Sequence, residues 1–340
     1  MSEHTPGDAH RHNAIDVHAH YYPKAFLDLV AAQGPALGVE WRMIEGKGPQ
    51  FKIGHLMTGP VGPRFVDLET RLAAMDEQGV AVHALSLSQP MVYWAGRALG
   101  EKLAATFNEE LARAHERAPQ RLVGLAMLPM HEPDLAAREA ERAAGLPGVR
   151  GFYLATRVNE RELSDESFLP VYERIESLGL PVFLHPVFVL APERLAKFYL
   201  TNLLGNPFES AIAAAHLVFG GVLDRFPKLD WVLPHAGGAF PWLAGRLNRG
   251  WEKREELRKI ERAPVDYLRR FHYDTIGYSE HVLDYLARVI GPDRILMGSD
   301  YCFPIAYERP VEVVTAHPRL DEAAKRMIVE GNARRLLRLG

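Results

Sequence analysis

The run Ile15-Asp16-Val17-His18-Ala19-His20 lies near the start of the chain and joins a short apolar stretch to two histidines. Because side chains alternate between the two faces of a β-strand, His18 and His20 are expected to point the same way. Two imidazoles that project together from a strand end are able to hold one metal ion. A half-buried strand with two incidental histidines is the alternative, and the rest of the chain decides between these two interpretations.

Further β-rich apolar segments follow this strand, and helical patterns separate them. The expected strands are residues 14–18, 81–87, 122–128, 149–154, 181–185, 230–235, 271–276 and 294–299. The expected helices are residues 67–78, 98–118, 134–144, 167–179, 208–224, 240–258, 279–290 and 320–338. Residues 122–128 and 181–185 are nearly continuous apolar runs, which is typical of strands buried on both faces. This alternation predicts an α/β fold made of a single (β/α)8 barrel of the TIM type.

Three stretches depart from the repeat. Residues 1–13 are polar and are expected to form a disordered leader, so the barrel is expected to span residues 14–340. Residues 40–65 carry short alternating segments around a glycine-rich turn, which predicts a small β-hairpin insert after the first strand. The long segment 186–206, which follows the fifth strand, is a candidate lid.

The composition is that of an ordinary globular protein, with 47% hydrophobic and 24% charged residues among 340. A net charge of −3 gives no basic surface for nucleic acid or for an anionic membrane. The apolar runs are far shorter than the ~20 residues that a membrane span needs. Cys302 is the only cysteine, and the N-terminus lacks an apolar signal core. We therefore expect a cytoplasmic protein that binds neither nucleic acid nor membrane.

Four of the expected strands end in residues that bind metals or transfer protons. The first strand ends at His18 and His20, the fifth at His185, the sixth at His235 and the eighth next to Asp300. Active sites of (β/α)8 barrels lie at the carboxyl ends of the strands. Three of these imidazoles together with the carboxylate suit zinc, with one coordination position left for water.

Several longer motifs contain these residues or lie between them. They are Asp16-Val-His-Ala-His20, Met75-Asp-Glu-Gln-Gly-Val80, Leu128-Pro-Met130, His185-Pro186, Gly220-Gly-Val-Leu-Asp-Arg-Phe-Pro-Lys-Leu229, His235-Ala-Gly-Gly-Ala-Phe-Pro241, Gly298-Ser-Asp-Tyr301 and Gly331-Asn-Ala333. Together they resemble the amidohydrolase superfamily, in particular the branch of 2-amino-3-carboxymuconate-6-semialdehyde decarboxylase and related metal-dependent decarboxylases. The resemblance extends from about residue 14 to residue 336.

The resemblance implies a metal site and a base. It implies that His18, His20, His185 and Asp300 bind one zinc ion (Zn²⁺), with Mn²⁺ or Fe²⁺ as alternatives in the cell. It also implies that His235 is the general base acting on a metal-bound water. Zinc lowers the pKa of water to roughly 7, close to that of histidine, so proton exchange between them is easy. Asp300 is the alternative proton carrier, because a carboxylate ligand keeps one free oxygen.

Two arginines are candidate substrate-binding residues. The resemblance implies that Arg71 binds a substrate carboxylate and that Arg246 reaches into the site of a neighbouring subunit, so we expect a homodimer. Guanidinium groups pair bidentately with carboxylates. A solvated helix arginine is the alternative for each. Asp274, near the end of the seventh strand, either supports a metal ligand or makes a cap or loop hydrogen bond.

We therefore expect a zinc-dependent, non-oxidative decarboxylase that uses metal-bound hydroxide and acts on a small unsaturated or aromatic carboxylic acid. A metal-dependent hydrolase of an amide, lactone or cyclic ester is the first alternative, and release of carbon dioxide distinguishes the two. A hydratase is a third option. Many amidohydrolases bridge two metals with a carboxylated lysine on the fourth strand. No lysine occurs between Lys102 and Lys197 here, which favours one metal. No glycine-rich phosphate loop occurs, so we expect no organic cofactor.

Overall fold

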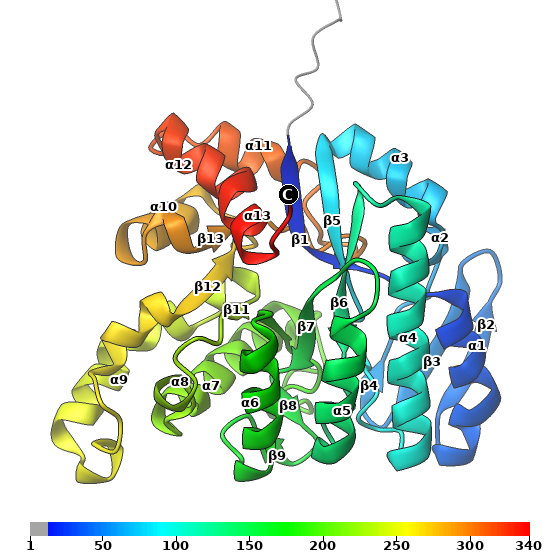
Figure 1. Cartoon of the computed structure of the whole chain (residues 1–340), viewed down its shortest axis with the longest axis horizontal. Helices are drawn as coiled ribbons and strands as arrows, with labels where there is room; N and C mark the ends of the chain where they lie inside the picture. Colours follow the sequence, from blue (N-terminus) through cyan, green and yellow to red (C-terminus); the bar gives the residue numbers. More distant parts are fainter. Residues whose placement is uncertain (1–12) are drawn as a thin grey trace, which may run out of the picture.

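An eight-stranded parallel sheet forms the centre of the molecule in the computed structural model, which describes residues 13–340 (Figure 1). In their order around the sheet the strands are β1 (Ala14–His20), β5 (Val80–Ser86), β6 (Leu122–Met127), β7 (Val149–Ala155), β10 (Val182–His185), β11 (Trp231–Leu233), β12 (Phe271–Asp274) and β13 (Ile295–Leu296). The segment after β13 returns to β1, where Val17 N–H donates to Met297 C=O and Asp300 N–H donates to His18 C=O, both at 3.0 Å. These bonds bring the sheet close to a closed circle and confirm the expected TIM-type barrel.

Helices surround the strands (Figure 1). The α-helices are α1 (Lys24–Gln33), α2 (Pro63–Val66), α3 (Leu68–Gln78), α4 (Arg97–Arg117), α5 (Pro133–Ala144), α6 (Leu169–Leu178), α7 (Asn206–Phe219), α8 (Val222–Arg225), α9 (Phe240–Lys253), α10 (Glu280–Val289), α11 (Pro310–Thr315), α12 (Glu322–Arg326) and α13 (Asn332–Leu336). Shorter 3-10 or π segments are η1 (Gly34–Leu37), η2 (Glu166–Phe168), η3 (Thr201–Gly205), η4 (His235–Gly237), η5 (Glu255–Leu257), η6 (Pro264–Arg270), η7 (Pro292–Arg294) and η8 (Met327–Gly331). Within residues 13–340 none of these helices is long and apolar enough to cross a membrane.

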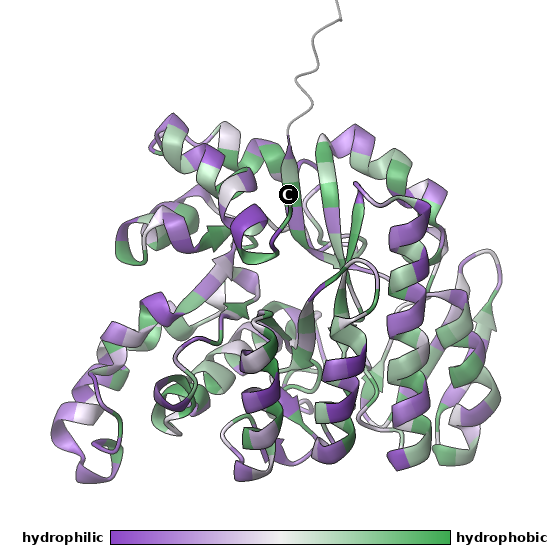
Figure 2. Cartoon of the chain, in the orientation of Figure 1, coloured by the Kyte–Doolittle hydropathy of each residue, from purple (hydrophilic) through white to green (hydrophobic). Residues whose placement is uncertain are grey.

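The helices pack on the barrel through one face. Hydrophilic and hydrophobic residues alternate along α4 and α5, because one side of each helix faces solvent and the other faces the strands (Figure 2). Asn108 of α4 lies on the inner side and is fully buried. Its side-chain amide donates to Met127 C=O at 2.9 Å and accepts from Met127 N–H at 2.7 Å. These two bonds fasten α4 to β6 where a leucine would provide only apolar contact.

Local signals fix the ends of α3, the helix that carries Arg71. The carboxylate of Asp67 accepts a hydrogen bond from Thr70 N–H at 2.6 Å and so caps the first turn. At the other end Gly79 has a φ of 70°, the left-handed conformation that glycine adopts without a Cβ clash. The sequence predicted this helix at residues 67–78, within one residue of its observed start.

Several expected elements differ in detail. The helix expected at 208–224 is divided into α7 and α8 at Gly221, whose φ is 70°. The helix expected at 320–338 is a run of α12, η8 and α13, with a π segment in the middle. The expected leader, residues 1–13, lies outside the described residues except for Asn13.

The region after β1 is more elaborate than expected. Helix α1 follows β1 directly, and the helical pattern there was missed. Residues 40–57 then form the antiparallel strands β2 (Glu40–Ile44), β3 (Gly48–Ile53) and β4 (Leu56–Met57). A further antiparallel pair, β8 (Arg157–Val158) and β9 (Arg161–Glu162), follows β7.

Candidate metal centre

The two histidines of β1 meet end to end at the carboxyl end of the barrel. The Nε2 atoms of His18 and His20 lie 3.1 Å apart. Both side chains are buried, and they point the same way because they stand two residues apart on one strand. Each outer nitrogen has its own partner: Nδ1 of His18 lies 2.8 Å from Oδ2 of Asp274, and Nδ1 of His20 lies 3.2 Å from Oγ of Ser86.

His185 and Asp300 complete the cluster from other strands. The imidazole of His185, at the end of β10, has its centroid 4.9 Å from that of His20 and 5.3 Å from that of His18. Oδ1 of Asp300 lies 3.1 Å from Nε2 of His20 and 3.5 Å from Nε2 of His18. One ligand atom from each of these four residues lies within 4.8 Å of the other three. Three buried imidazoles and a carboxylate of this geometry form a site for a divalent metal ion.

The surrounding hydrogen bonds test whether these residues fit a metal. Because the carboxylate of Asp274 only accepts, Nδ1 of His18 donates to it and Nε2 of His18 carries a lone pair. That lone pair faces Oδ1 of Asp300, another electron-rich atom, at 3.5 Å. His185 Nδ1 has no hydrogen-bond partner among the described residues. A cation between these atoms removes their mutual repulsion, so the donor set fits a bound metal.

Burial sets the charge of most of these groups. It lowers the pKa of His20 to about 4 and the pKa of His185 well below its ordinary value, so both imidazoles are neutral and able to bind a metal. Burial also lowers the pKa of His18, but the hydrogen bond to Asp274 and the charge of Asp300 raise it overall. Burial raises the pKa of Asp300, but the contact with His20 and the charges of the neighbouring histidines lower it overall, so this carboxyl stays ionised.

His235 stands beside the cluster on an unusual turn. Its ring centroid lies 5.2 Å from that of His18 and 5.5 Å from that of His185. Burial lowers the pKa of His235, and its Nδ1 has no hydrogen-bond partner among residues 13–340. The turn requires Gly238, because a Cβ there would lie 2.1 Å from the carbonyl oxygen of Pro207. The turn therefore places the His235 imidazole next to the metal site. Because burial keeps this imidazole neutral, it is able to take up a proton.

The comparison with known families agrees with this geometry. Residues 15–339 match the family model described as amidohydrolase. The chain belongs to the amidohydrolase family. This confirms the resemblance that the sequence motifs indicated.

Several relatives of this amidohydrolase are named decarboxylases, and one from a Sphingobium species is named a 2-keto-4-carboxy-3-hexenedioate hydratase. A 2-amino-3-carboxymuconate-6-semialdehyde decarboxylase from Dictyostelium discoideum is 28% identical over 96% of this chain and 91% of its own length. The structure of a 5-carboxyvanillate decarboxylase from Sphingomonas paucimobilis is 28% identical and has a TM-score of 0.84 over 97% of this chain and 100% of that one. The structure of a dihydroxybenzoic acid decarboxylase from a Polaromonas species contains manganese and the inhibitor 2-nitroresorcinol. It is 25% identical, with a TM-score of 0.79 over 96% of this chain and 97% of that one.

Arg71 of this amidohydrolase lies behind the metal residues and is fully buried. Its guanidinium donates to the carbonyl oxygen of His20 and lies 3.2 Å from Nδ1 of His83. The same group stacks over the ring of Tyr301 at 4.8 Å. Because arginine only donates, His83 accepts at Nδ1 and directs Nε2 toward Asp16, whose Oδ2 is 3.5 Å away. The interaction of Arg71 with a substrate carboxylate stays a prediction.

The rim of the site offers another arginine. The ring of Phe303 lies 5.1 Å from that of His20, and the ring of Phe65 lies 5.3 Å from that of Phe303. Arg64, next to Phe65, is exposed, and its guanidinium lies 4.9 Å from the centre of the Tyr301 ring. No carboxylate among the described residues pairs with it. Sequence reasoning overlooked Arg64, because no motif contains it.

Arg246 lies on the exposed side of α9 and makes no ion pair among residues 13–340. Helix α9 projects from the edge of the molecule (Figure 1). Large apolar side chains are exposed on α9 and on the adjoining α7 and η3: Leu203, Leu204, Phe208, Trp242 and Leu243. We call these five residues the α9 patch. Exposed apolar residues on neighbouring elements are often part of an interaction surface.

Proposed function

We propose that this amidohydrolase is a metal-dependent, non-oxidative decarboxylase of a small unsaturated or aromatic carboxylic acid. The observation that carries the proposal is the convergence of His18, His20, His185 and Asp300 beside His235. The named activities of its relatives support decarboxylation, since 5-carboxyvanillate and dihydroxybenzoic acid are small aromatic acids. The cluster alone supports metal chemistry in general.

We assign one divalent ion to the four ligands, with zinc as the first candidate because three imidazoles and one carboxylate suit it. Manganese is the second candidate, and its presence in the Polaromonas relative supports it. When bound, the ion supplies a Lewis acid that polarises the substrate. His18→Ala and Asp300→Ala are each expected to lose the ion, because each removes one of the four ligands. Elemental analysis of the purified variants measures this.

His235 is the proposed proton carrier. Decarboxylation breaks the bond between the carboxylate and the neighbouring carbon, leaves the electron pair on that carbon and requires a proton in place of carbon dioxide. Burial lowers the pKa of His235, so the imidazole is neutral near pH 7 and becomes a good acid once it has taken up a proton. Asp300 is the alternative carrier through its second carboxylate oxygen. The metal residues are shielded from bulk solvent, since His18 and Asp300 are only 4% and 3% exposed.

We propose that substrate carboxylates are bound by arginine and that two chains share each site. Arg246 and the α9 patch lie on one side of the molecule, which suits a homodimer in which Arg246 enters the partner's site. Both terminal nitrogens of Arg71 already contact this chain, at the carbonyl oxygen of His20 and at Nδ1 of His83, whereas its Nε has no partner among the described residues. Arg64 on the rim is the alternative within the same chain, since it is exposed and carries no carboxylate partner among the described residues.

The test is a substrate screen on protein that has been stripped of metal and then reloaded with Zn²⁺ or Mn²⁺. Carboxylated phenols and muconate semialdehydes make up the panel, with simple amides and lactones beside them. We expect carbon dioxide release from at least one carboxylate, and only with metal. Hydrolysis of the amides or lactones without carbon dioxide release would favour the hydrolase instead.

A further inference from the structure

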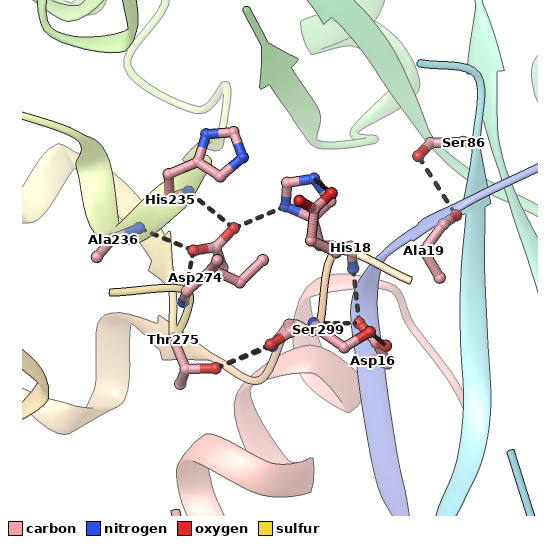
Figure 3. A network of polar contacts seen from close by, with 12 residues as sticks. Asp16, His18, Ala19, Ser86, His235, Ala236, Asp274, Thr275 and Ser299 are labelled. Atoms are coloured by element: carbon pink, nitrogen blue, oxygen red, sulfur yellow. Dashed lines mark hydrogen bonds and ion pairs between the residues drawn. The ribbon is translucent and has the colours of Figure 1, made fainter. Parts of the chain in front are cut away.

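Asp274 is the most heavily hydrogen-bonded side chain around the metal residues. It ends β12 and is 1% exposed. Oδ2 accepts from Nδ1 of His18 at 2.8 Å and from His235 N–H at 3.0 Å. Oδ1 accepts from Ala236 N–H at 2.8 Å and from Ile276 N–H at 3.0 Å. Figure 3 shows this carboxylate between the ring of His18 and the turn that carries His235.

The contact with His18 determines which nitrogen of that imidazole is free. A neutral imidazole carries one proton, and the carboxylate fixes that proton on Nδ1. Nε2 is then left with its lone pair, and it is Nε2 that lies 3.1 Å from Nε2 of His20 and 3.5 Å from Oδ1 of Asp300. Without the carboxylate the proton would be free to move to Nε2 and block the metal.

The contact with the turn compensates for an unfavourable backbone. His235 and Ala236 have φ values of 53° and 57°, in the left-handed region that residues with a Cβ rarely adopt. Their N–H groups both point at the Asp274 carboxylate. Two hydrogen bonds to a buried charge hold this conformation and so fix where the His235 ring stands.

We infer that Asp274 is a positioning residue that aligns the metal ligand His18 and the proton carrier His235 through one carboxylate. The inference rests on the proposed metal site, and it adds a residue that joins the two functional parts of that site. A ligating histidine commonly donates its second N–H to a carboxylate, and loss of such a partner costs roughly 10–100-fold in metal affinity or activity. Here the same carboxylate also accepts a hydrogen bond from the backbone N–H of the proposed base, His235.

Metal affinity is the decisive measurement, because it does not depend on turnover. The dissociation constants of Zn²⁺ and Mn²⁺ are measured by chelator competition for wild type, Asp274→Ala, Asp274→Asn and Thr275→Val. Thr275 is the matched control: it is buried, follows Asp274 directly and exchanges two hydrogen bonds with the backbone of Gly298, at 3.2 and 3.1 Å. Its side chain makes no hydrogen bond to either histidine among residues 13–340.

We expect Asp274→Ala to weaken metal binding roughly 10–100-fold and Thr275→Val to weaken it less than about threefold. The metal affinity of Asp274→Asn should lie between those of the other two variants. Its side-chain oxygen can accept from Nδ1 of His18 only when its NH2 group faces the N–H groups of Ala236 and Ile276. At saturating metal, kcat of Asp274→Ala should stay below that of Thr275→Val, since the His235 turn is loosened. Equal metal affinity in Asp274→Ala and Thr275→Val would overturn the inference. Wild type that binds neither metal would instead refute the proposed function.

Neutron diffraction of the wild-type protein keeps the inference testable if Asp274→Ala does not fold. The expected result, in crystals kept at a pH at which His18 is neutral, is a deuteron on Nδ1 of His18, directed at Oδ2 of Asp274, and none on Nε2. A deuteron on Nε2 with none on Nδ1 would overturn the inference, because the carboxylate would then not control the tautomer.

Discussion

The Nε2 atoms of His18 and His20 lie 3.1 Å apart at the end of β1, with Oδ1 of Asp300 3.1 Å from the second of them. The pleat of the strand produces the first distance, since residues two apart share a face. The return of the chain beside β1 produces the second, through the bond from Asp300 N–H to His18 C=O. A hydrogen bond that brings the barrel close to closure therefore also brings together three of the four metal-binding residues.

His235→Asn should lower kcat by roughly 10²–10⁴-fold while the metal content stays near that of wild type. Asparagine removes the imidazole but tolerates the left-handed φ of 53° at this position better than alanine does. Turnover and elemental analysis are measured on the same preparation. Loss of the metal in this variant would show that His235 is a ligand rather than a proton carrier.

Arg246→Ala should raise KM for a carboxylated substrate about tenfold to hundredfold, since a hydrogen bond to a charged group contributes roughly 1.5–3 kcal/mol. Stability should change by less than about 0.5 kcal/mol, because the side chain is exposed. Thermal unfolding and steady-state kinetics measure the two effects.

Mixing His235→Asn chains with Arg246→Ala chains tests the shared site. A mixed dimer has one site with both defects and one site with neither, so activity should return above that of either parent. If subunits exchange and activity does not return, Arg246 does not act in the partner's site.

Arg71→Met and Arg64→Met separate two ways of binding a carboxylate. Arg71→Met should lower the free energy of unfolding by roughly 1.5–3 kcal/mol, because it leaves the buried carbonyl of His20 without its charged donor. Arg64→Met should change stability by less than about 0.5 kcal/mol and raise KM. Denaturant unfolding measures the stability of both variants, and steady-state kinetics measures their KM. Wild-type stability with a raised KM in Arg71→Met would establish instead that Arg71 binds substrate.

Metal binding should weaken as the pH falls from about 8 to about 6, because a histidine must lose its proton to bind a metal. The pKa of His18 is lowered by burial but raised overall by Asp274 and Asp300, so protons compete with the metal first at this ligand. His20, whose pKa is about 4, should contribute to the competition only at lower pH. Titration calorimetry at several pH values measures the trend. An affinity that is constant across this range would contradict the assignment of His18.

The sequence predicted those parts of the molecule that depend on local pattern. Periodicity located the barrel strands, and the ends of those strands identified His185 and His235 as well as the pair on β1. The shortest barrel strand, β13, was expected at 294–299 but covers only two residues. The junction with β1 is completed by single backbone bonds, from Val17 N–H to Met297 C=O and from Asp300 N–H to His18 C=O.

Contacts between distant residues could not be predicted in this way. Asp274 and His18 are separated by 256 residues, and the strand pattern left a helix cap or a loop hydrogen bond as equally good interpretations for Asp274. Arg71 was expected to bind a substrate carboxylate, and its contact with the carbonyl oxygen of His20, 51 residues away, could not be predicted from the pattern of α3. A helical pattern predicts which side of a helix is buried. It does not predict which other element that side packs against.

The release of labelled carbon dioxide as a function of metal per chain tests the central claim most directly. Metal-free protein is titrated with Zn²⁺ or Mn²⁺ in the presence of carboxyl-¹³C-labelled substrates identified by the screen, and the label is followed by NMR. We predict that labelled carbon dioxide forms only with metal, and that its rate rises until there is one ion for each set of His18, His20, His185 and Asp300. Conversion that leaves the label in the product, release without metal, or a rate that rises up to two ions per chain would contradict the account.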